Sequence, residues 1–365
     1  MDRLMTEPAL TAPIFATLTV SAVEHDTRNS VTVTLETDGD NRFRFAHGQH
    51  LTFRRMFDDI EIRRSYSICA PSPDGQLRVG IKRVEGGVFS TWATTELEAG
   101  VELDVMTPTG HFTHDLVSTS ARRYALVAAG SGITPVYSIA ATILAEEPAS
   151  VVSLVCVNQN SNSIMLLDDI EALRNRYLGR VQIWNVLTQE ATEIPLLEGR
   201  PDADRLGAMI HAGILPAEPD HVFVCGPEGL VANVRNAYLA VGTEADVIHD
   251  ELFTSSQVGQ LSTAPQIIEQ GEQPIGTGYA ILHGRATGFD IYQGDTVLDA
   301  AQRTRPDAPF SCRSGICSTC RAHLVEGVVE MNVTHGLVAG EEQAGYILTC
   351  QAFAKTSNVR VDFDR

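Results

Sequence analysis

The stretch Cys312-Arg313-Ser314-Gly315-Ile316-Cys317-Ser318-Thr319-Cys320 places three of the seven cysteines within nine residues. A fourth cysteine, Cys350, ends the largely apolar stretch 345–350, which has the pattern of a short strand and would return its thiol to the loop. Gly315 and the small serines allow the backbone to curl closely around a bound group, with its N–H groups turned towards sulfur. The stretch therefore predicts a metal-binding loop that a distant strand completes.

Cys-x4-Cys-x2-Cys followed by a distant cysteine is the ligand spacing of a plant-type [2Fe–2S] cluster. We predict one cluster held by four thiolates: Cys312, Cys317, Cys320 and Cys350. The alternatives are a zinc site or free thiols, but zinc ribbons usually pair two Cys-x2-Cys motifs, and the chain has only one such gap. Cys69 and Cys156 lie in apolar, strand-like stretches and are predicted to be small buried residues.

The length of 365 residues predicts two or three domains. The formal charge of −19 argues against non-specific nucleic-acid binding. Residues 277–365 hold eight Lys or Arg and ten Asp or Glu, a charge of −2, so the other −17 lies on residues 1–276. No apolar run is long enough to span a membrane, and the first eleven residues lack the pattern of a signal peptide. We expect a cytoplasmic protein that binds no membrane.

Three patterns of secondary structure divide the chain. Residues 12–117 hold short alternating stretches, at 14–23, 31–36, 50–55, 77–84 and 101–106, which predict an antiparallel β-barrel or sandwich. In residues 118–255, strand-like runs alternate with helical segments, which predicts a doubly wound parallel α/β domain. Residues 256–276 are rich in Ser, Gln, Gly, Pro and Glu and predict a linker. Residues 277–365 resume strands around the four cysteines and form a third domain.

A first cofactor site is predicted at the end of a strand-like segment of the first domain. The spacing of Arg64, Tyr66 and Ser67 puts Arg64 and Tyr66 on one strand face, where a guanidinium can clamp a diphosphate and a phenol ring can stack. An exposed strand with a salt bridge would look the same. The turn 86–91 leads into a helix and could present N–H groups to a phosphate. An ordinary helix N-cap is the alternative.

A second site is predicted at one edge of the parallel sheet. The glycine turn 128–135 lies between the first parallel strand and its helix, where doubly wound sheets bind nucleotides, although it lacks the full G-x-G-x-x-G pattern. Cys225-Gly226-Pro227 follows the fourth strand at the same edge. In the alternative interpretation both are tight strand-to-helix turns.

Together, and in this order, Arg64-x-Tyr66-Ser67, Gly87-x-x-Ser90, the turn 130–135 and Cys225-Gly226-Pro227 resemble the ferredoxin–NADP reductase superfamily. With a C-terminal ferredoxin, the order is similar to that of the reductase components of oxygenases. The stretches 64–70, 82–92, 108–112 and 345–364 resemble the reductase subunits of phenylacetyl-CoA epoxidases, and ketosteroid hydroxylase reductases come next. The resemblance implies a flavin barrel, a nicotinamide domain and a β-grasp [2Fe–2S] ferredoxin domain.

The resemblance also implies the cofactors FAD, the [2Fe–2S] cluster and NADPH or NADH, with specific residues for each. Arg64 would contact the FAD diphosphate, Tyr66 would pack on the isoalloxazine and Ser67 would lie near its N5. The rest of the flavin would be held by Lys82, Gly87, Val88 and Ser90. The nicotinamide cofactor would meet Gly130, Gly132, Ile133, Thr134, Pro135, Cys225, Gly226 and Pro227, with Cys225 near the nicotinamide ring. Near the flavin, in the segment that closes this domain, would lie Glu251 and Phe253.

The choice between NADPH and NADH depends on the end of the second parallel strand. Relatives that use NADPH often carry Asn-Arg there, and this sequence has Asn158-Gln159-Asn160. Glutamine cannot supply the positive charge that a 2′-phosphate needs. Arg174 or Arg176 on the following helix would compensate, unless both belong to a solvated helix face. The sequence leans only slightly towards NADPH.

The implied activity is electron transfer, with no dedicated catalytic acid or base. NAD(P)H gives two electrons as a hydride, a [2Fe–2S] cluster takes one at a time, and a flavin can do both. The expected acceptor is a partner oxygenase, either the multi-subunit di-iron phenylacetyl-CoA epoxidase or a ketosteroid or other ring-hydroxylating oxygenase. A flavin enzyme with a structural or sensing cluster is a different interpretation. The eleven histidines are scattered along the sequence and predict no second metal centre.

Four arginines surround the cluster loop in sequence: Arg303, Arg305, Arg313 and Arg321. We expect them to help an acidic patch of the oxygenase dock near the loop, with electron transfer that slows as salt is added. The alternative is that these arginines pair with local carboxylates such as Asp299 and Asp307.

Overall fold

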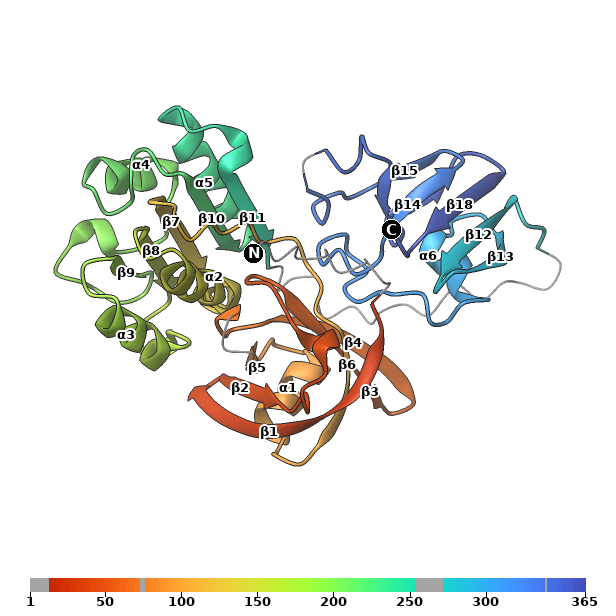
Figure 1. Ribbon diagram of the computed structural model, residues 1–365, viewed down its shortest axis with the longest axis horizontal. Coiled ribbons are helices and arrows are strands. Elements are labelled where there is room, and N and C mark those ends of the chain that lie inside the picture. Colours follow the sequence, from red (N-terminus) through yellow and green to blue (C-terminus); the bar gives the residue numbers. More distant parts are fainter. Residues whose placement is uncertain (1–12, 73–75, 254–271, 339) are drawn as a thin grey trace, which may run out of the picture. The chain divides into compact units, whose positions relative to one another are not determined.

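The structure is a computed structural model that describes residues 13–72, 76–253, 272–338 and 340–365 (Figure 1). The chain forms two compact units, a larger one of residues 16–260 and a smaller one that contains residues 261–365. Among the described helices, none is both long enough and apolar enough to cross a membrane. The predicted linker, 256–276, lies mostly outside the described residues, and the predicted domain limits stay predictions.

The larger unit begins with a six-stranded antiparallel sheet that closes into a barrel. In β2 the alternating residues Val31, Val33 and Leu35 are buried, which is the period-two pattern of a strand with one face in a core. An isolated bridge between Ile68, just after β4, and Val79 of β5 joins the two edge strands of the sheet. In sheet order the strands are β4 (Ile60–Ser67), β3 (His50–Phe57), β6 (Glu102–Met106), β1 (Phe15–Thr27), β2 (Ser30–Leu35) and β5 (Leu77–Lys82), with helix α1 (Val88–Thr95) between β5 and β6.

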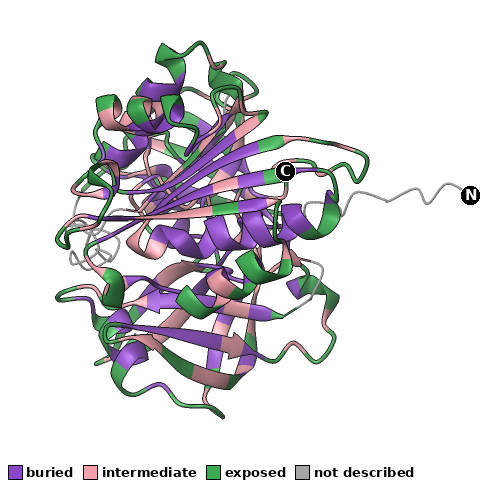
Figure 2. Cartoon of the chain, turned by 90° about the vertical axis from the view of Figure 1, so that its left-hand side faces the viewer, coloured by how far each residue is buried: buried purple, intermediate pink, exposed green. Residues whose placement is uncertain are grey.

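The second part of the larger unit is a five-stranded parallel sheet. In sheet order its strands are β11 (Ile248–Leu252), β10 (His221–Gly226), β7 (Arg123–Ala129), β8 (Val151–Asn158) and β9 (Val181–Leu187). Helices α2 (Ile133–Glu146) and α3 (Leu167–Arg176) lie on one face, and α4 (Ala203–His211) and α5 (Glu228–Ala240) on the other (Figure 1). Because both faces are covered, β7 is almost continuously buried, as the purple strands of Figure 2 illustrate.

The order of these strands reverses at β7, because the chain adds strands first on one side of it and then on the other. After β7 the chain adds β8 and β9 on one side, and then returns to place β10 and β11 on the other. The carboxyl ends of β7 and β10 therefore flank a topological switch point, which is where open α/β sheets bind ligands. Both glycine turns singled out in the sequence lie at this edge.

The smaller unit contains a five-stranded mixed sheet packed on one short helix, the β-grasp arrangement. The helix is α6 (Val297–Gln302), which is capped by the Thr296 side chain and is buried along its length. In sheet order the strands are β13 (Arg285–Ile291), β12 (Gly276–Leu282), β18 (Asn358–Asp362), β14 (Arg321–Glu326) and β16 (Tyr346–Leu348). A separate pair is formed by β15 (Val329–Met331) and β17 (Ala352–Ala354). The cluster loop lies between α6 and β14.

Candidate functional site

The barrel presents the first predicted site on strand β4. Arg64 and Tyr66 are two residues apart on this strand and both are half-buried, so they share a strand face, whereas Ser67 is buried. The Tyr66 ring packs against Phe53 and Phe89, with centroids 5.9 and 5.7 Å apart. Burial raises the pKa of the Tyr66 phenol, so this side chain stays neutral. The arrangement offers a cation and an aromatic ring side by side.

The turn before α1 forms the second part of the barrel site. The Ser90 hydroxyl accepts a hydrogen bond from the Val84 N–H (3.1 Å) and donates to the Gly87 carbonyl (3.3 Å), so it holds the turn together. A Cβ on Gly87 would lie 2.6 Å from the Ser90 Oγ, which explains the glycine. The first N–H groups of α1, at Val88 and the residues after it, have no helical acceptor and are suited to a phosphate.

The glycine turn after β7 forms the nicotinamide side. Gly130 has a φ of +54°, in the left-handed region that favours glycine. A Cβ on Gly132 would lie 2.3 Å from the Cys225 carbonyl oxygen, so the two predicted turns touch through their backbones. Ile133 and Thr134 are buried, as is Pro135. The three residues therefore position the turn, and the half-buried Gly130 and Ser131 are the part that can face a ligand.

Beside the turn, a thiol and a carboxyl group meet between β10 and β11. The Cys225 Sγ lies 3.9 Å from the Glu251 Oε2, and the two residues are partners in the strand register. Burial raises the pKa of Glu251 to about 8 and raises the pKa of the Cys225 thiol, so both groups keep their protons at pH 7. The Phe253 N–H donates to the Gly226 carbonyl (2.9 Å) and holds the end of β11 against the second turn. Pro227, the last residue of that turn, is the N-cap of α5.

The barrel site and the nicotinamide site adjoin. Lys82, at the end of β5, has its Nζ 3.4 Å from where a Cβ on Gly130 would lie, and burial lowers the pKa of this amine. Two residues earlier on the same strand, a Cβ on Gly80 would lie 2.5 Å from the Thr134 methyl group. Since hydride donor and acceptor must approach to about 3–3.5 Å, this close packing of β5 on the start of α2 suits transfer between two adjoining ligands.

In the smaller unit, the cluster loop turns its backbone N–H groups towards sulfur. The N–H groups of Ser314 and Cys317 lie 3.4 Å from the Cys312 Sγ, and the Cys312 N–H lies 3.4 Å from the Cys317 Sγ. Gly315 has a φ of +76°, and a Cβ there would lie 2.8 Å from the Gln351 side chain. The loop therefore has the tight geometry that its sequence predicts.

The four cysteines perturb each other's pKa in two pairs, Cys312 with Cys317 and Cys320 with Cys350. The neighbouring Cys317 side chain lowers the pKa of Cys312, and the neighbouring Cys350 side chain lowers the pKa of Cys320. In the described ranges no three His, Cys, Asp or Glu side chains surround a single point as the ligands of one metal ion would. Backbone N–H groups face the sulfurs of Cys312 and Cys317, as they do around the thiolates of a [2Fe–2S] cluster, so these residues fit the predicted group.

Three domain families match consecutive parts of the chain. The oxidoreductase FAD-binding domain matches residues 17–114, the oxidoreductase NAD-binding domain residues 126–236, and the 2Fe-2S iron-sulfur cluster binding domain residues 281–355. A subunit of 1,2-phenylacetyl-CoA epoxidase from Escherichia coli is 36% identical over 96% of this chain and 98% of its own length. The ferredoxin reductase component of 3-ketosteroid-9-alpha-monooxygenase from Rhodococcus rhodochrous is 30% identical over 95% of this chain and 96% of its own.

The chain belongs to the family of oxygenase reductase components. It is an oxidoreductase with an FAD-binding, an NAD-binding and a [2Fe–2S] domain. A solved phthalate dioxygenase reductase shares the fold, with a TM-score of 0.57 at 22% identity over 95% of this chain and 98% of that one. The reductase therefore has the flavin barrel, the parallel nicotinamide sheet and the ferredoxin domain that the sequence predicts.

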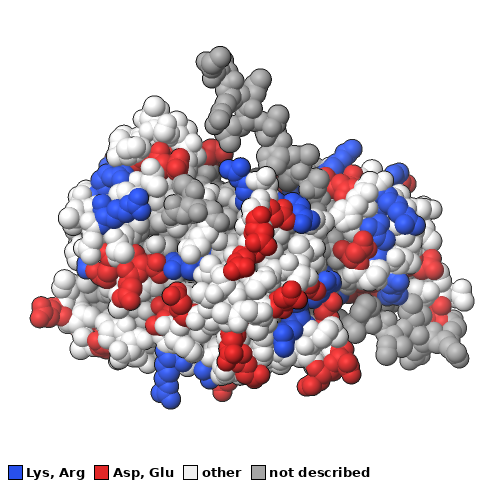
Figure 3. Space-filling view, turned by 60° about the horizontal axis from the view of Figure 1, so that its bottom comes forward, with Lys and Arg blue, Asp and Glu red and all other residues white. Residues whose placement is uncertain are grey.

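The arginines around the cluster loop of the reductase are paired. Their partners are Asp295 for Arg303, Asp307 for Arg305, Asp299 for Arg313 and Glu341 for Arg321. This arrangement agrees with the alternative of local pairing, and Asp299 and Asp307 are two of the partners that the sequence suggests. On the face that Figure 3 presents, acidic and basic side chains are likewise interspersed. The structure thus weakens the electrostatic argument for docking at this loop.

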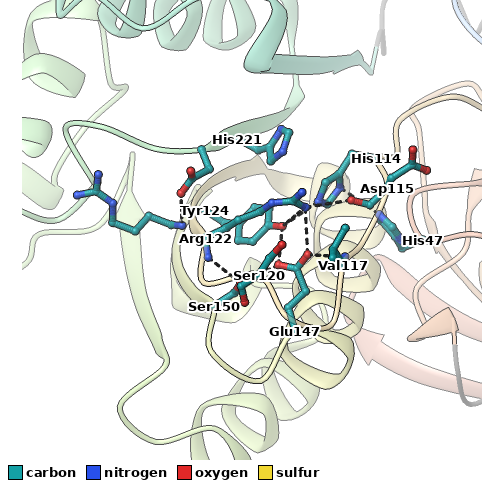
Figure 4. A network of polar contacts seen from close by, with 12 residues as sticks. His47, His114, Asp115, Val117, Ser120, Arg122, Tyr124, Glu147, Ser150 and His221 are labelled. Carbon is teal, nitrogen blue, oxygen red and sulfur yellow. Dashed lines mark hydrogen bonds and ion pairs between the residues drawn. The ribbon is translucent and has the colours of Figure 1, made fainter.

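Sequence reasoning missed a polar network at the opposite, amino edge of the parallel sheet (Figure 4). His114 lies between His47 of the barrel (3.3 Å) and the Tyr124 hydroxyl at the start of β7 (2.9 Å), and that hydroxyl donates to the buried Glu147 (2.8 Å). His221 and His249 lie beside it, 3.1 Å apart. Histidines that look scattered in sequence therefore gather here, and no short motif could have revealed it.

Proposed function

We propose that this reductase takes electrons from a nicotinamide dinucleotide and delivers them singly to the oxygenase component of a phenylacetyl-CoA epoxidase. The observation that carries the proposal is the combination of a cysteine loop whose N–H groups face sulfur with two adjoining glycine turns, in a chain 36% identical to one subunit of such an epoxidase along 98% of that protein's length. When bound, the flavin accepts a hydride and passes on single electrons, which the cluster can accept.

The residues of the chain bind and orient these groups. Arg64 would hold the flavin diphosphate, with Tyr66 against the ring and the start of α1 at a phosphate. The turn Gly130–Gly132 and the amino end of α2 would hold the nicotinamide dinucleotide. The protonated Glu251 and Cys225 present no negative charge next to the position of hydride transfer.

Reconstitution tests the choice of partner. The purified reductase is mixed with the oxygenase subunits of a phenylacetyl-CoA epoxidase, NAD(P)H and phenylacetyl-CoA, and the epoxide and NAD(P)H oxidation are measured together. A second candidate is the oxygenase of a ketosteroid hydroxylase, because a reductase of that class is 30% identical over 95% of this chain. We expect coupled product only with the epoxidase. Coupling only with the ketosteroid oxygenase would reassign the partner.

An anaerobic spectrum tests the electron path itself. Excess NAD(P)H is added to the holoprotein, and the flavin and [2Fe–2S] absorption bands are followed. We expect both bands to bleach. A cluster that stays oxidised while the flavin is reduced would support a structural or sensing role for the ferredoxin domain.

We also propose that the oxygenase covers the cluster loop, because electron transfer needs a short path to the acceptor. Since the four arginines already have carboxylate partners, we expect the transfer rate to depend less on salt than an unpaired arginine rim would make it.

A further inference from the structure

The end of β8 is where a doubly wound sheet distinguishes the two nicotinamide cofactors. A dinucleotide lies across the carboxyl edge of the sheet, with its pyrophosphate at the first glycine turn. Its adenosine ribose reaches the end of the next strand, where an acidic residue bonds the 2′-hydroxyl of NADH or an arginine meets the 2′-phosphate of NADPH. In this chain that strand is β8, and Asn158, Gln159 and Asn160 supply neither charge.

An acidic residue nevertheless reaches this position from the neighbouring strand. Glu190, in the loop after β9, accepts hydrogen bonds from the N–H (2.8 Å) and the hydroxyl (3.0 Å) of Ser161. The N–H groups of Thr188 and Gln189 donate to the carbonyls of Asn158 and Gln159 (2.9 and 2.8 Å), so the two loops run together beyond the sheet. The carboxylate is thereby fixed at the end of β8.

One oxygen of this carboxylate remains for a ligand. Both bonds from Ser161 go to the Glu190 Oε2, and within the described part of the chain the Oε1 accepts none. Glu190 is exposed, so solvent or a bound ribose can reach this oxygen. The group can accept a hydrogen bond from a 2′-hydroxyl, and its charge repels a 2′-phosphate.

The charged residues around Glu190 also favour NADH over NADPH. The two loops, residues 159–166 and 188–200, contain three glutamates and one basic residue, Arg200. Arg174 and Arg176 lie in the last turn of α3. The helix begins at the carboxyl edge of the sheet and runs away from it, so Arg174 lies about 10 Å along the helix axis from that edge. Arg174 pairs with Glu171, and Arg176 lies over the Tyr177 ring, so neither supplies the missing cation.

We propose that Glu190, held at the end of β8 by Ser161, makes this reductase select NADH over NADPH. In other doubly wound sheets an acidic residue at the end of the second strand bonds the ribose. Here Glu190, in the loop after the third strand β9, has that role. The inference rests on the proposed function in one respect, that residues 126–236 bind the dinucleotide that reduces the flavin.

The first measurement is the rate of flavin reduction in the holoprotein by each cofactor, taken as kcat/KM with ferricyanide as acceptor. We expect NADH to be used at least tenfold more efficiently than NADPH, since a fixed carboxylate faces a dianionic phosphate across solvent; about tenfold corresponds to about 1.4 kcal/mol. A preference for NADPH would overturn the inference and leave the proposed function intact. Failure of both cofactors to reduce the flavin would overturn the proposed function itself.

The decisive variant is Glu190→Gln. Glutamine keeps an oxygen that can accept from Ser161 and removes only the charge, so the NADH to NADPH ratio should fall by about tenfold. Glu193→Gln is the matched control, because it removes the same charge from an exposed residue of the same loop and should leave the ratio unchanged. If both variants lower the ratio equally, the effect belongs to the net charge of the loop and the assignment to Glu190 is wrong.

A binding measurement separates this effect from catalysis. Titration calorimetry with 2′,5′-ADP, which carries the 2′-phosphate without a nicotinamide, should show about tenfold tighter binding to the Glu190→Gln holoprotein than to the unchanged one. Arg200→Gln tests the opposing possibility that this arginine binds the phosphate. A loss of 2′,5′-ADP binding in that variant, with no gain in Glu190→Gln, would overturn the inference.

Discussion

Replacing Gly132 with alanine adds a methyl group where the two glycine turns touch. The added Cβ would lie 2.3 Å from the carbonyl oxygen of Cys225, 2.7 Å from its carbonyl carbon and 3.2 Å from its sulfur. The nearest atoms belong to the backbone of β10, so no side chain can rotate away. Gly132 has a φ of −60° and a ψ of −11°, which alanine adopts readily. The whole effect is therefore steric.

The structure sets the size of this effect. Relief of the contact requires the turn and the end of β10 to separate by about 1 Å, and overpacking of this kind costs about 1–3 kcal/mol. For a unit of this size, the melting temperature should fall by about 2–10 °C. Because a misplacement of about 1 Å can cost about a hundredfold in rate, flavin reduction by NADH should slow by at least tenfold.

The assay is anaerobic stopped-flow reduction of the flavin, combined with calorimetric melting of the holoprotein. Gly229→Ala is the control, since a Cβ there meets no atom within 4 Å and α5 favours alanine over glycine. It should keep the rate and melt at the same or a higher temperature. A Gly132→Ala protein with an unchanged rate and melting temperature would refute the contact between the turns, and with it the geometry of the nicotinamide site.

Three further outcomes test other parts of the molecule. Burial lowers the pKa of His47 from 6.5 to about 4 in the folded chain; folding therefore favours neutral His47, and its contribution to stability should be constant above about pH 6.5 and fall below it by at most about 1.4 kcal/mol per pH unit, which urea unfolding measures as the difference in slope between the unchanged chain and His47→Gln. Because Glu251 loses its proton near pH 8, flavin reduction should slow as the pH rises through this value, and a Glu251→Gln variant that keeps the same step would assign the ionisation to another group. Cys317→Ser should remove the [2Fe–2S] absorption and electron delivery to an oxygenase while NADH still reduces the flavin; an intact cluster band in this variant would exclude Cys317 as a ligand.

The features that sequence predicts here are those that lie within a few residues of one another. The cysteine spacing, the turn 130–135 and the alternation in β2 each depend on local backbone geometry, which leaves a pattern in the sequence. For strand β4 the sequence indicates only the end, because the adjacent Arg63 and Arg64 interrupt the alternation of apolar residues. Arg63 is nevertheless buried, with its guanidinium on Glu61.

The features that sequence does not predict are contacts between distant residues. Glu190 bonds Ser161 across 29 positions, and His47 bonds His114 across 67. Each depends on the order of strands in a sheet, and that order leaves no local trace at either residue. The Arg313–Asp299 pair spans only 14 positions, and it is one of the two alternatives that the sequence allows. The sequence cannot decide between these alternatives, because a free and a paired arginine have the same neighbours in the chain.

The two edges of the parallel sheet have different kinds of contact, and this difference follows from what each must do. At the carboxyl edge the two turns meet where Gly132 packs closely on the backbone of Cys225. At the amino edge, about 20 Å away along β7, His47 of the barrel is tied through His114 and Tyr124 to the buried Glu147. A ligand site that lies between the barrel and the sheet needs both parts held in a fixed relation, yet side-chain bonds at the site would compete with the ligand. Placing the polar tether at the far edge meets both needs, and it explains why the histidines gather where no cofactor is expected.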